Sequence, residues 1–195
     1  MAQYVNIHTH RPTGRHIEPS SIGIHPYDVD NEDISSISHR IGEVSAIGET
    51  GLDFIRGGDR ERQYTLLRRQ LALACENDMP VVLHCVRALE PLMKVLEEYH
   101  LRAVIFHGFI GSAEQAKRAA ERGYYLSFGE RAFSSPRTVE ALRATPLRLL
   151  FLETDDSPIG IEEIYASAAV IKGLTVEKLR EEILKNYHTI FGNDE

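Results

Sequence analysis

Short apolar runs alternate along the chain with stretches of helical periodicity. Between Asp59 and Asn77, apolar side chains recur at offsets of three and four, which predicts a helix with one buried face. Strands that alternate with such helices are typical of a parallel sheet with helices outside it. The seven expected strands are Tyr4–Ile7, Ser21–Ile24, Val44–Gly48, Val81–Leu83, Ala103–Phe106, Tyr124–Phe128 and Leu147–Leu152.

Capping residues mark the ends of several predicted helices. Ser112, with a glutamine three residues later, forms a capping box that predicts a helix over Ala113–Arg122, and Gly123 ends it. Thr175 is the expected N-cap of a helix over Val176–Phe191. The other expected helices are Leu89–Tyr99, Ser135–Ala144 and Ile161–Lys172.

The segment Arg11–Ser20 interrupts this alternation. It holds two prolines and a glycine and has no helical periodicity. A parallel crossover normally needs a dozen or more residues and usually a helix. We therefore expect an α/β, TIM-barrel-like fold that is distorted or incomplete, with about seven parallel strands, in a single domain over residues 1–195.

Polar residues with metal-ligand chemistry stand at or just past the C-terminal ends of five of these strands. An α/β barrel places its reactive groups on this face. Imidazole and carboxylate sets of this kind suit Zn²⁺, Mn²⁺, Ni²⁺ or Mg²⁺. The pattern predicts a metal-dependent hydrolase. The six candidate metal ligands are His8, His10, Glu49, His84, His107 and Asp155.

Each candidate also has a plainer interpretation. His8 and His10 point to the same face of a strand and could share an ion, or they could be exposed polar residues. Glu49 lies between glycines, where its two oxygens could bridge two ions, or it could belong to a surface turn. A single histidine at a strand end, like His84 or His107, would more often be a core residue. Asp155 could bind metal and accept a proton from an activated water, so Asp155 and Glu49 are the candidate catalytic residues.

Neighbouring polar residues leave more than one role open. Asp53 could orient substrate, hydrogen-bond a ligand or cap a loop, whereas Glu153 suits a structural or supporting role. Cys85 fits a buried inert thiol better than a nucleophile. Two further residues, His25 and Tyr27, could line the pocket or be structural, and four arginines in or near strand-end loops could hold a phosphate or be solvated: Arg11, Arg56, Arg87 and Arg131.

Charge and composition narrow the possible partners. The formal net charge of −7 argues against broad adhesion to nucleic acid but not against a nuclease, because bound metals supply local positive charge. The two cysteines fit a reducing cytosol. The start of the chain lacks the pattern of a signal peptide, and no apolar run reaches membrane-spanning length. We expect a soluble cytoplasmic protein with no membrane partner. The oligomeric state is left open.

Taken in order, the motifs resemble those of the TatD family of metal-dependent deoxyribonucleases, within the amidohydrolase-like TIM barrels. The resemblance spans nearly the whole chain and suggests a shortened member, with the shortfall largely between His10 and Gly23. The matching stretches are residues 8–10, 23–26, 48–53, 70–74, 84–85, 106–112 and 152–155, with Asn186 and Phe191 near the C-terminus.

The resemblance implies two divalent ions in one site. One ion would be surrounded by His8, His10, Glu49 and Asp155, and the other by Glu49, His84 and His107. The family hydrolyses phosphodiester bonds in DNA. One departure is that Arg87 stands three positions after His84, where the family often has an arginine two positions on.

Three functional hypotheses follow. The first is a two-metal phosphodiesterase, a deoxyribonuclease that acts on DNA. The second keeps the metals but changes the substrate to a small phosphoester, ester or amide, since barrels vary their chemistry through loops. The third is a non-catalytic relative that binds metal or a partner. We favour the first, and the intact ligand set counts against the third.

Overall fold

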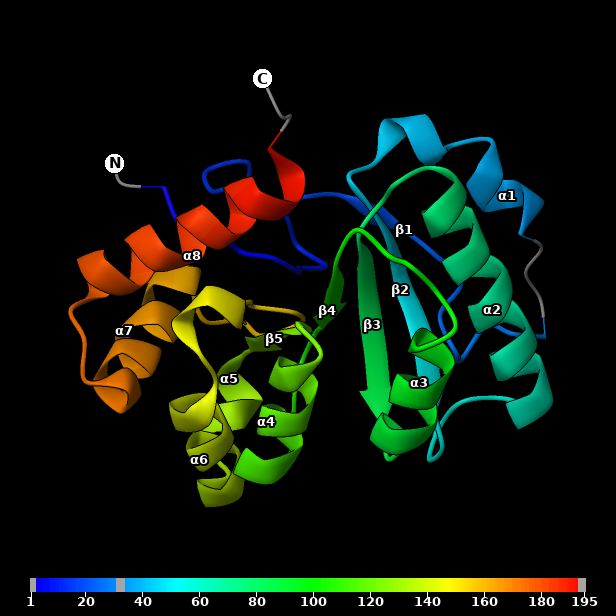
Figure 1. Cartoon of the computed structure of the whole chain (residues 1–195). Helices are drawn as coiled ribbons and strands as arrows, with labels where there is room; N and C mark the ends of the chain where they lie inside the picture. Colours follow the sequence, from blue (N-terminus) through cyan, green and yellow to red (C-terminus); the bar gives the residue numbers. More distant parts are fainter. Residues whose placement is uncertain (1–2, 31–33, 193–195) are drawn as a thin grey trace. The chain divides into compact units, whose positions relative to one another are not determined.

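The chain divides into two units. One is a contiguous middle segment, and the other combines the two segments that flank it. The structure is a computed structural model and describes residues 3–30 and 34–192. Unit 2 is Ser20–Phe106, and unit 1 combines Met1–Pro19 with His107–Glu195. Figure 1 traces the elements of each unit along the chain. That the whole chain acts as a single domain stays a prediction.

Unit 2 is built on four parallel strands that pair in chain order. Its longest strand, β2, runs beside β3 with Gly51 opposite His84. Leu52 and Leu83 on these strands are fully buried. The strands are β1 (Ser21–Ile22), β2 (Ala46–Asp53), β3 (Val81–Val86) and β4 (Val104–Phe106).

The principal helix of unit 2 confirms the predicted periodicity. Helix α2 (Arg60–Glu76) packs against β2, and its Leu67 and Leu71 are fully buried. Asp59 caps it by accepting a hydrogen bond from the Arg62 N–H, at 3.0 Å. The other helices of the unit are α1 (Ser35–Ser38), the 3₁₀ turn η1 (Ile41–Glu43) and α3 (Leu89–Leu96).

Unit 1 holds the remaining two strands and most of the helices. Strands β5 (Tyr125–Phe128) and β6 (Leu150–Leu152) pair in parallel. The predicted Ser112 capping box is confirmed, as is the Thr175 cap. The helices are α4 (Ala113–Glu121), α5 (Glu130–Phe133), α6 (Pro136–Ala144), the 3₁₀ turn η2 (Leu147–Leu149), α7 (Ile161–Lys172) and α8 (Val176–Phe191).

The expected strand Tyr4–Ile7 is not formed, so the described residues contain six strands and not seven. Val5 makes only an isolated bridge to Ile17, and the Val5 carbonyl accepts a hydrogen bond from the Tyr165 hydroxyl, at 2.9 Å. A side chain thus takes an acceptor that a ladder would use. The expected absence of a helix over residues 11–20 is confirmed. Among the described residues, no helix is long and apolar enough to cross a membrane.

Candidate metal centre

Ligand-type side chains form one group in each unit of the chain. The unit 2 group is His25, Glu49 and His84. The unit 1 group is His8, His10, His107 and Asp155, in which His8, His107 and Asp155 form one triad. In each of these two triads the candidate ligand atoms lie within 4.8 Å of one another. This spacing suits donors that surround one ion at roughly 2.0–2.2 Å.

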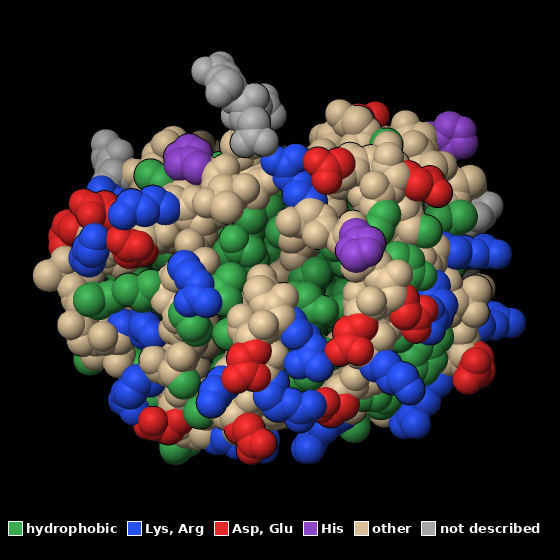
Figure 2. Space-filling model, viewed as in Figure 1, with side chains coloured by type: hydrophobic (Ala, Val, Ile, Leu, Met, Phe, Trp, Pro, Cys, Tyr) green, Lys and Arg blue, Asp and Glu red, His purple; other side chains and the backbone are tan. Residues whose placement is uncertain are grey.

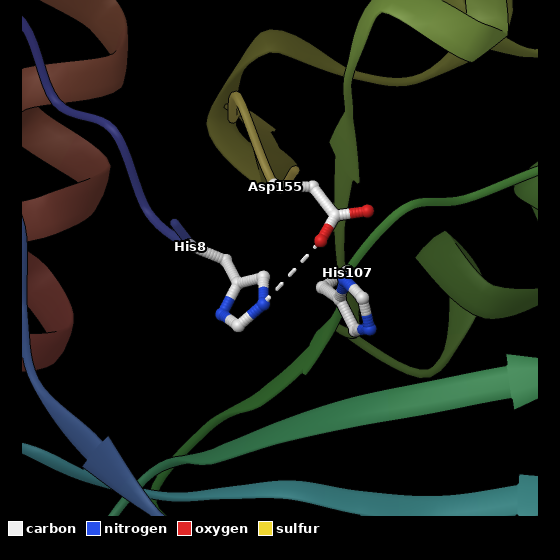
Figure 3. A group of neighbouring side chains, drawn as sticks. All are labelled: His8, His107 and Asp155. Carbon is white, nitrogen blue, oxygen red and sulfur yellow. Dashed lines mark ion pairs between the residues drawn. The ribbon is translucent and has the colours of Figure 1, made fainter. Parts of the chain in front are cut away.

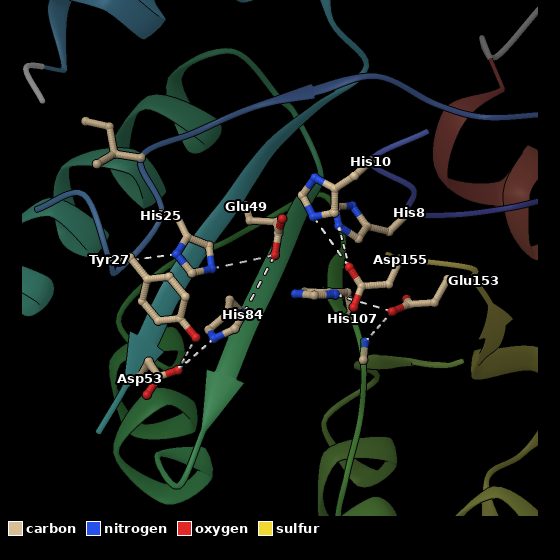
Figure 4. Close-up of polar contacts among 12 residues, drawn as sticks. His8, His10, His25, Tyr27, Glu49, Asp53, His84, His107, Glu153 and Asp155 are labelled. Atoms are coloured by element: carbon tan, nitrogen blue, oxygen red, sulfur yellow. Dashed lines mark hydrogen bonds and ion pairs between the residues drawn. The ribbon is translucent and has the colours of Figure 1, made fainter. Parts of the chain in front are cut away.

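The unit 2 group is centred on the Glu49 carboxylate. Its Oε2 atom lies 3.7 Å from His84 Nδ1 and 3.8 Å from His25 Nε2. The two histidine rings lie 4.4 Å apart, centroid to centroid, and Figure 4 shows both next to this carboxylate. Two imidazoles and one carboxylate are a donor set that divalent first-row metals accept.

Glycine lets the two strands of unit 2 approach closely enough to form this group. A Cβ added to Gly51 would lie 1.9 Å from the carbonyl oxygen of His84, and Gly51 has a φ of +147°. Neither the space nor the backbone conformation admits a larger residue. The glycine therefore brings the strand that carries Glu49 against the strand that carries His84.

A buried glutamine on α2 fixes the backbone on both sides of the group. The Gln70 side chain accepts a hydrogen bond from the Ile24 N–H at 2.7 Å and donates to the Thr50 hydroxyl at 2.6 Å. Ile24 precedes His25, and Thr50 follows Glu49. One side chain thus holds the loop of the histidine and the strand of the carboxylate.

Asp53 orients His84 and caps a loop at the same time. Its Oδ2 atom lies 3.0 Å from His84 Nε2, and its Oδ1 atom accepts hydrogen bonds from the N–H groups of Ile55 and Arg56. Burial raises the pKa of Asp53, but the hydrogen bonds from Arg56, His84 and Ile55 outweigh burial and lower the pKa to about 2. An ionised Asp53 keeps the proton of His84 on Nε2, which leaves Nδ1 as the lone pair that faces Glu49.

Replacing Asp53 with asparagine should weaken metal binding roughly 10- to 100-fold, because the neutral amide is a weaker acceptor for the His84 N–H and no longer fixes one tautomer. Calorimetric titration of the chelator-treated protein with Zn²⁺ measures this change. Equal affinities for Zn²⁺ would mean that Asp53 serves only to cap the loop.

The same variant tests the lowered pKa of Asp53 in the metal-free protein. A depressed pKa stabilises the folded state above the unfolded pKa of 3.8, and this contribution is lost as the pH falls toward 2. The wild type should therefore lose about 2 kcal/mol of unfolding free energy relative to D53N between pH 5 and pH 2. Urea unfolding across this pH range gives the comparison.

In unit 1, backbone pairing brings Asp155 to the two N-terminal histidines. The Asp155 N–H donates to the His8 carbonyl at 3.1 Å, and the His10 N–H donates to the Asp155 carbonyl at 3.2 Å. The Asp155 Oδ1 atom then lies 3.4 Å from His10 Nε2 and 3.9 Å from His8 Nε2. Figure 3 shows His8 directed toward this carboxylate and the His107 ring beside it.

Glu153 supports His107 as Asp53 supports His84. The buried Glu153 Oε1 atom lies 3.3 Å from His107 Nδ1 and accepts the Gly108 N–H at 2.7 Å. Burial raises the pKa of Glu153, but the hydrogen bond from His107 and the charges of His107 and His8 lower it overall. The carboxylate holds the His107 proton on Nδ1 and leaves Nε2 as a lone pair. A carboxylate–histidine pair in each unit is the arrangement that metal-ligating histidines require, so the donor sets fit divalent ions.

The six residues predicted from the sequence all belong to the two groups, with Glu49 and His84 in one and the other four in the second. The expectation that all six share one pocket stays a prediction. From the sequence His25 could line a pocket or be structural, and the structure places it 3.8 Å from Glu49 in the unit 2 group. Burial raises the pKa of the Cys85 thiol to about 12, so this cysteine stays protonated and unreactive near neutral pH.

Comparison with known proteins gives consistent matches. The family model described as TatD related DNase matches residues 16–192. An uncharacterized metal-dependent hydrolase of Escherichia coli K12, YjjV, is 31% identical over 88% of this chain and 76% of its own. The 3'-5' ssDNA/RNA exonuclease TatD of Pantoea ananatis is 30% identical over 89% of this chain and 77% of its own. The crystal structure of YjjV superposes with a TM-score of 0.80 at 29% identity, over 90% of this chain and 77% of that one. The expected α/β, TIM-barrel-like fold class is thereby confirmed.

Proposed function

Because this chain belongs to the TatD family of metal-dependent hydrolases, we propose that it is a divalent-metal-dependent phosphodiesterase that cleaves DNA. The observation that carries the proposal is the pairing of a buried carboxylate with a strand-end histidine in each ligand group, Asp53 with His84 and Glu153 with His107. Such pairs orient histidines for metal binding. The Pantoea ananatis relative is named as a single-stranded DNA and RNA exonuclease, which supports a nucleic-acid substrate.

The proposed cofactors are two divalent ions, drawn from Zn²⁺, Mg²⁺, Mn²⁺ and Ni²⁺. When bound, such ions polarise a phosphodiester and lower the pKa of a bound water. Elemental analysis of the metal-loaded protein counts the ions per chain. Electron paramagnetic resonance of the Mn²⁺-loaded protein tests whether the ions lie in one pocket, because ions about 4 Å apart couple strongly.

In the proposed reaction, Asp155 accepts the proton of the attacking water on its carboxylate. Backbone hydrogen bonds to both N-terminal histidines hold the main chain of Asp155, and its Oδ1 atom lies 3.4 Å from His10 Nε2. Glu49 would be a ligand. Glu153 and Asp53 act as positioning residues, since each touches a histidine and holds its proton on one ring nitrogen.

The metal-loaded protein should cleave single-stranded DNA, and rising salt should weaken the cleavage only mildly. Positive and negative side chains are interspersed over the face shown in Figure 2, and the net charge is −7. Few phosphates are then neutralised outside the metals, and each contributes about −0.7 to the log–log salt slope. We expect a slope no steeper than about −2. Initial rates on a 5'-labelled oligonucleotide between 20 and 200 mM salt measure it.

Two other outcomes would point to the alternative functions. A metal-loaded protein that is inactive on every DNA substrate but hydrolyses a small phosphoester, ester or amide is a hydrolase of small molecules. A protein that binds metal and turns over none of these substrates is a non-catalytic relative. A cytoplasmic location and the absence of a membrane partner both stay predictions. Both cysteines, Cys75 and Cys85, are free thiols.

A further inference from the structure

Tyr27 has an anchored hydroxyl and an exposed ring. The hydroxyl donates a hydrogen bond to Asp53 Oδ2 at 3.1 Å, and Tyr27 as a residue is 42% exposed. A tyrosine fixed at its polar end presents its ring at a low entropic cost of ordering.

The anchored ring lies directly beside the unit 2 ligand group. The centroid of the Tyr27 ring is 4.2 Å from that of His25 and 5.7 Å from that of His84, both in edge-type contacts. In Figure 4 the hydroxyl points to Asp53, which also contacts His84. The ring therefore contacts one candidate metal ligand, His25, directly and is linked through Asp53 to a second, His84.

Two exposed side chains of the β2–α2 loop accompany the ring. The Arg56 guanidinium lies over the Tyr27 ring, 5.7 Å from its centroid. Ile55 is 66% exposed. The backbone N–H groups of both residues donate to Asp53 Oδ1, at 2.7 and 2.8 Å. Asp53 thus binds the Tyr27 hydroxyl and holds the backbone of the loop that carries Ile55 and Arg56.

A single exposed tyrosine is common on protein surfaces and carries no meaning alone. An aromatic ring that stacks a flat base, with a guanidinium that binds a phosphate, is the combination that recognises unpaired nucleotides. A paired base in a duplex does not offer its face to such a ring. We propose that Tyr27, Ile55 and Arg56 form a docking surface for one unpaired base and its neighbouring phosphate in a single nucleic-acid strand. The proposal rests on the proposed function, because it names the substrate form for the same site.

Substituting Tyr27 with leucine separates the base from the backbone as the recognised group. For a single-stranded oligonucleotide we expect the KM to rise about 10-fold in Y27L, the range of base–aromatic stacking. For an oligonucleotide of the same length with abasic sites, the KM should be the same in Y27L and wild type. Circular dichroism and Zn²⁺ binding establish that Y27L is folded and metal-competent.

Tyr27 to phenylalanine is the matched variant, because it keeps the ring and removes the hydroxyl. Y27F should retain most of the affinity for the base-containing strand. The docking proposal is wrong if Y27F loses as much affinity as Y27L for the base-containing strand. It is also wrong if the two variants lose affinity equally for the abasic strand. In either case Tyr27 acts only by holding Asp53.

Arginine substitutions test the phosphate contact. R56Q should raise the KM several-fold for both the base-containing and the abasic strand. R60Q is the control, since the exposed Arg60 guanidinium lies over Phe54 on the same unit, 4.3 Å from the ring centroid. Equal KM values for R56Q and R60Q would overturn the role of Arg56.

A binding measurement keeps this test separate from the proposed catalysis. Stacking on Tyr27 should quench the fluorescence of a 2-aminopurine base in a short single strand, and Y27L should lose most of the quenching. Quenching without cleavage would retain the docking surface and reject the phosphodiesterase proposal. Cleavage of the strand, with identical quenching in wild type and Y27L, would retain the phosphodiesterase proposal and reject the docking surface.

Discussion

Replacing Asp155 with asparagine should remove most hydrolytic activity, with a loss of 10²- to 10⁴-fold in turnover, about 3–5 kcal/mol of barrier. The amide keeps the shape of the side chain but accepts no proton near neutral pH and is a weaker metal ligand. The backbone hydrogen bonds to His8 and His10 do not involve the carboxylate, so they are retained. Turnover at saturating metal, measured on single-stranded DNA, is the decisive quantity.

The fold should survive this substitution because Asp155 has a φ of +52°, a conformation in which asparagine is well tolerated. Asp78 offers a matched control, with a φ of +49° and an exposed ion pair to Arg102. D78N should change neither turnover nor metal content. If D155N turns over at nearly the wild-type rate, Asp155 is not the proton acceptor.

Replacing Glu49 with glutamine should lower both the metal content and the activity. Glu49 supplies the only carboxylate of the unit 2 group, where its Oε2 atom faces His84 Nδ1. A neutral amide is a poorer ligand, so the ion of this group should dissociate. We expect turnover to fall on the order of 10³-fold, which is about 4 kcal/mol of activation free energy. Removing metal from the wild type with a chelator should lower turnover to a similar extent.

Elemental analysis and turnover should be measured on the same samples of E49Q. The exposed Glu43, which pairs with Arg40 in the same unit, provides the control E43Q. Loss of one equivalent of metal together with the activity is the expected result. Full metal content with full activity in E49Q would remove Glu49 from the site.

The sequence predicted best those features that local signals determine. Helices α7 and α8 begin and end at the predicted residues, because periodicity and caps such as Thr175 act within a few positions. The ligand candidates were also identified locally, since each stands at the polar end of an apolar run. Short helix α5 has too few residues for a periodic pattern and was not predicted.

Features that depend on distant partners could not be predicted. The partners of Tyr4–Ile7 include residues far along the chain: the Ile7 N–H donates to the Leu152 carbonyl, and the Val5 carbonyl accepts from the Tyr165 hydroxyl. The roles of Asp53 and Glu153 stayed open for the same reason. Asp53 lies 3.0 Å from His84 Nε2, and Glu153 lies 3.3 Å from His107 Nδ1. Only these distances identify the two carboxylates as partners of the histidine rings.

The order in which the units are encoded has a consequence for synthesis on the ribosome. Unit 2 is complete once Phe106 has emerged, so His25, Glu49 and His84 can assemble while translation continues. Unit 1 combines two segments that flank unit 2 in the chain, so His8 and His10, which precede unit 2, wait for Asp155, which follows it. A nascent chain arrested after residue 106 can therefore assemble only the His25, Glu49 and His84 group, and the histidines made first are among the last ligands to find their partner.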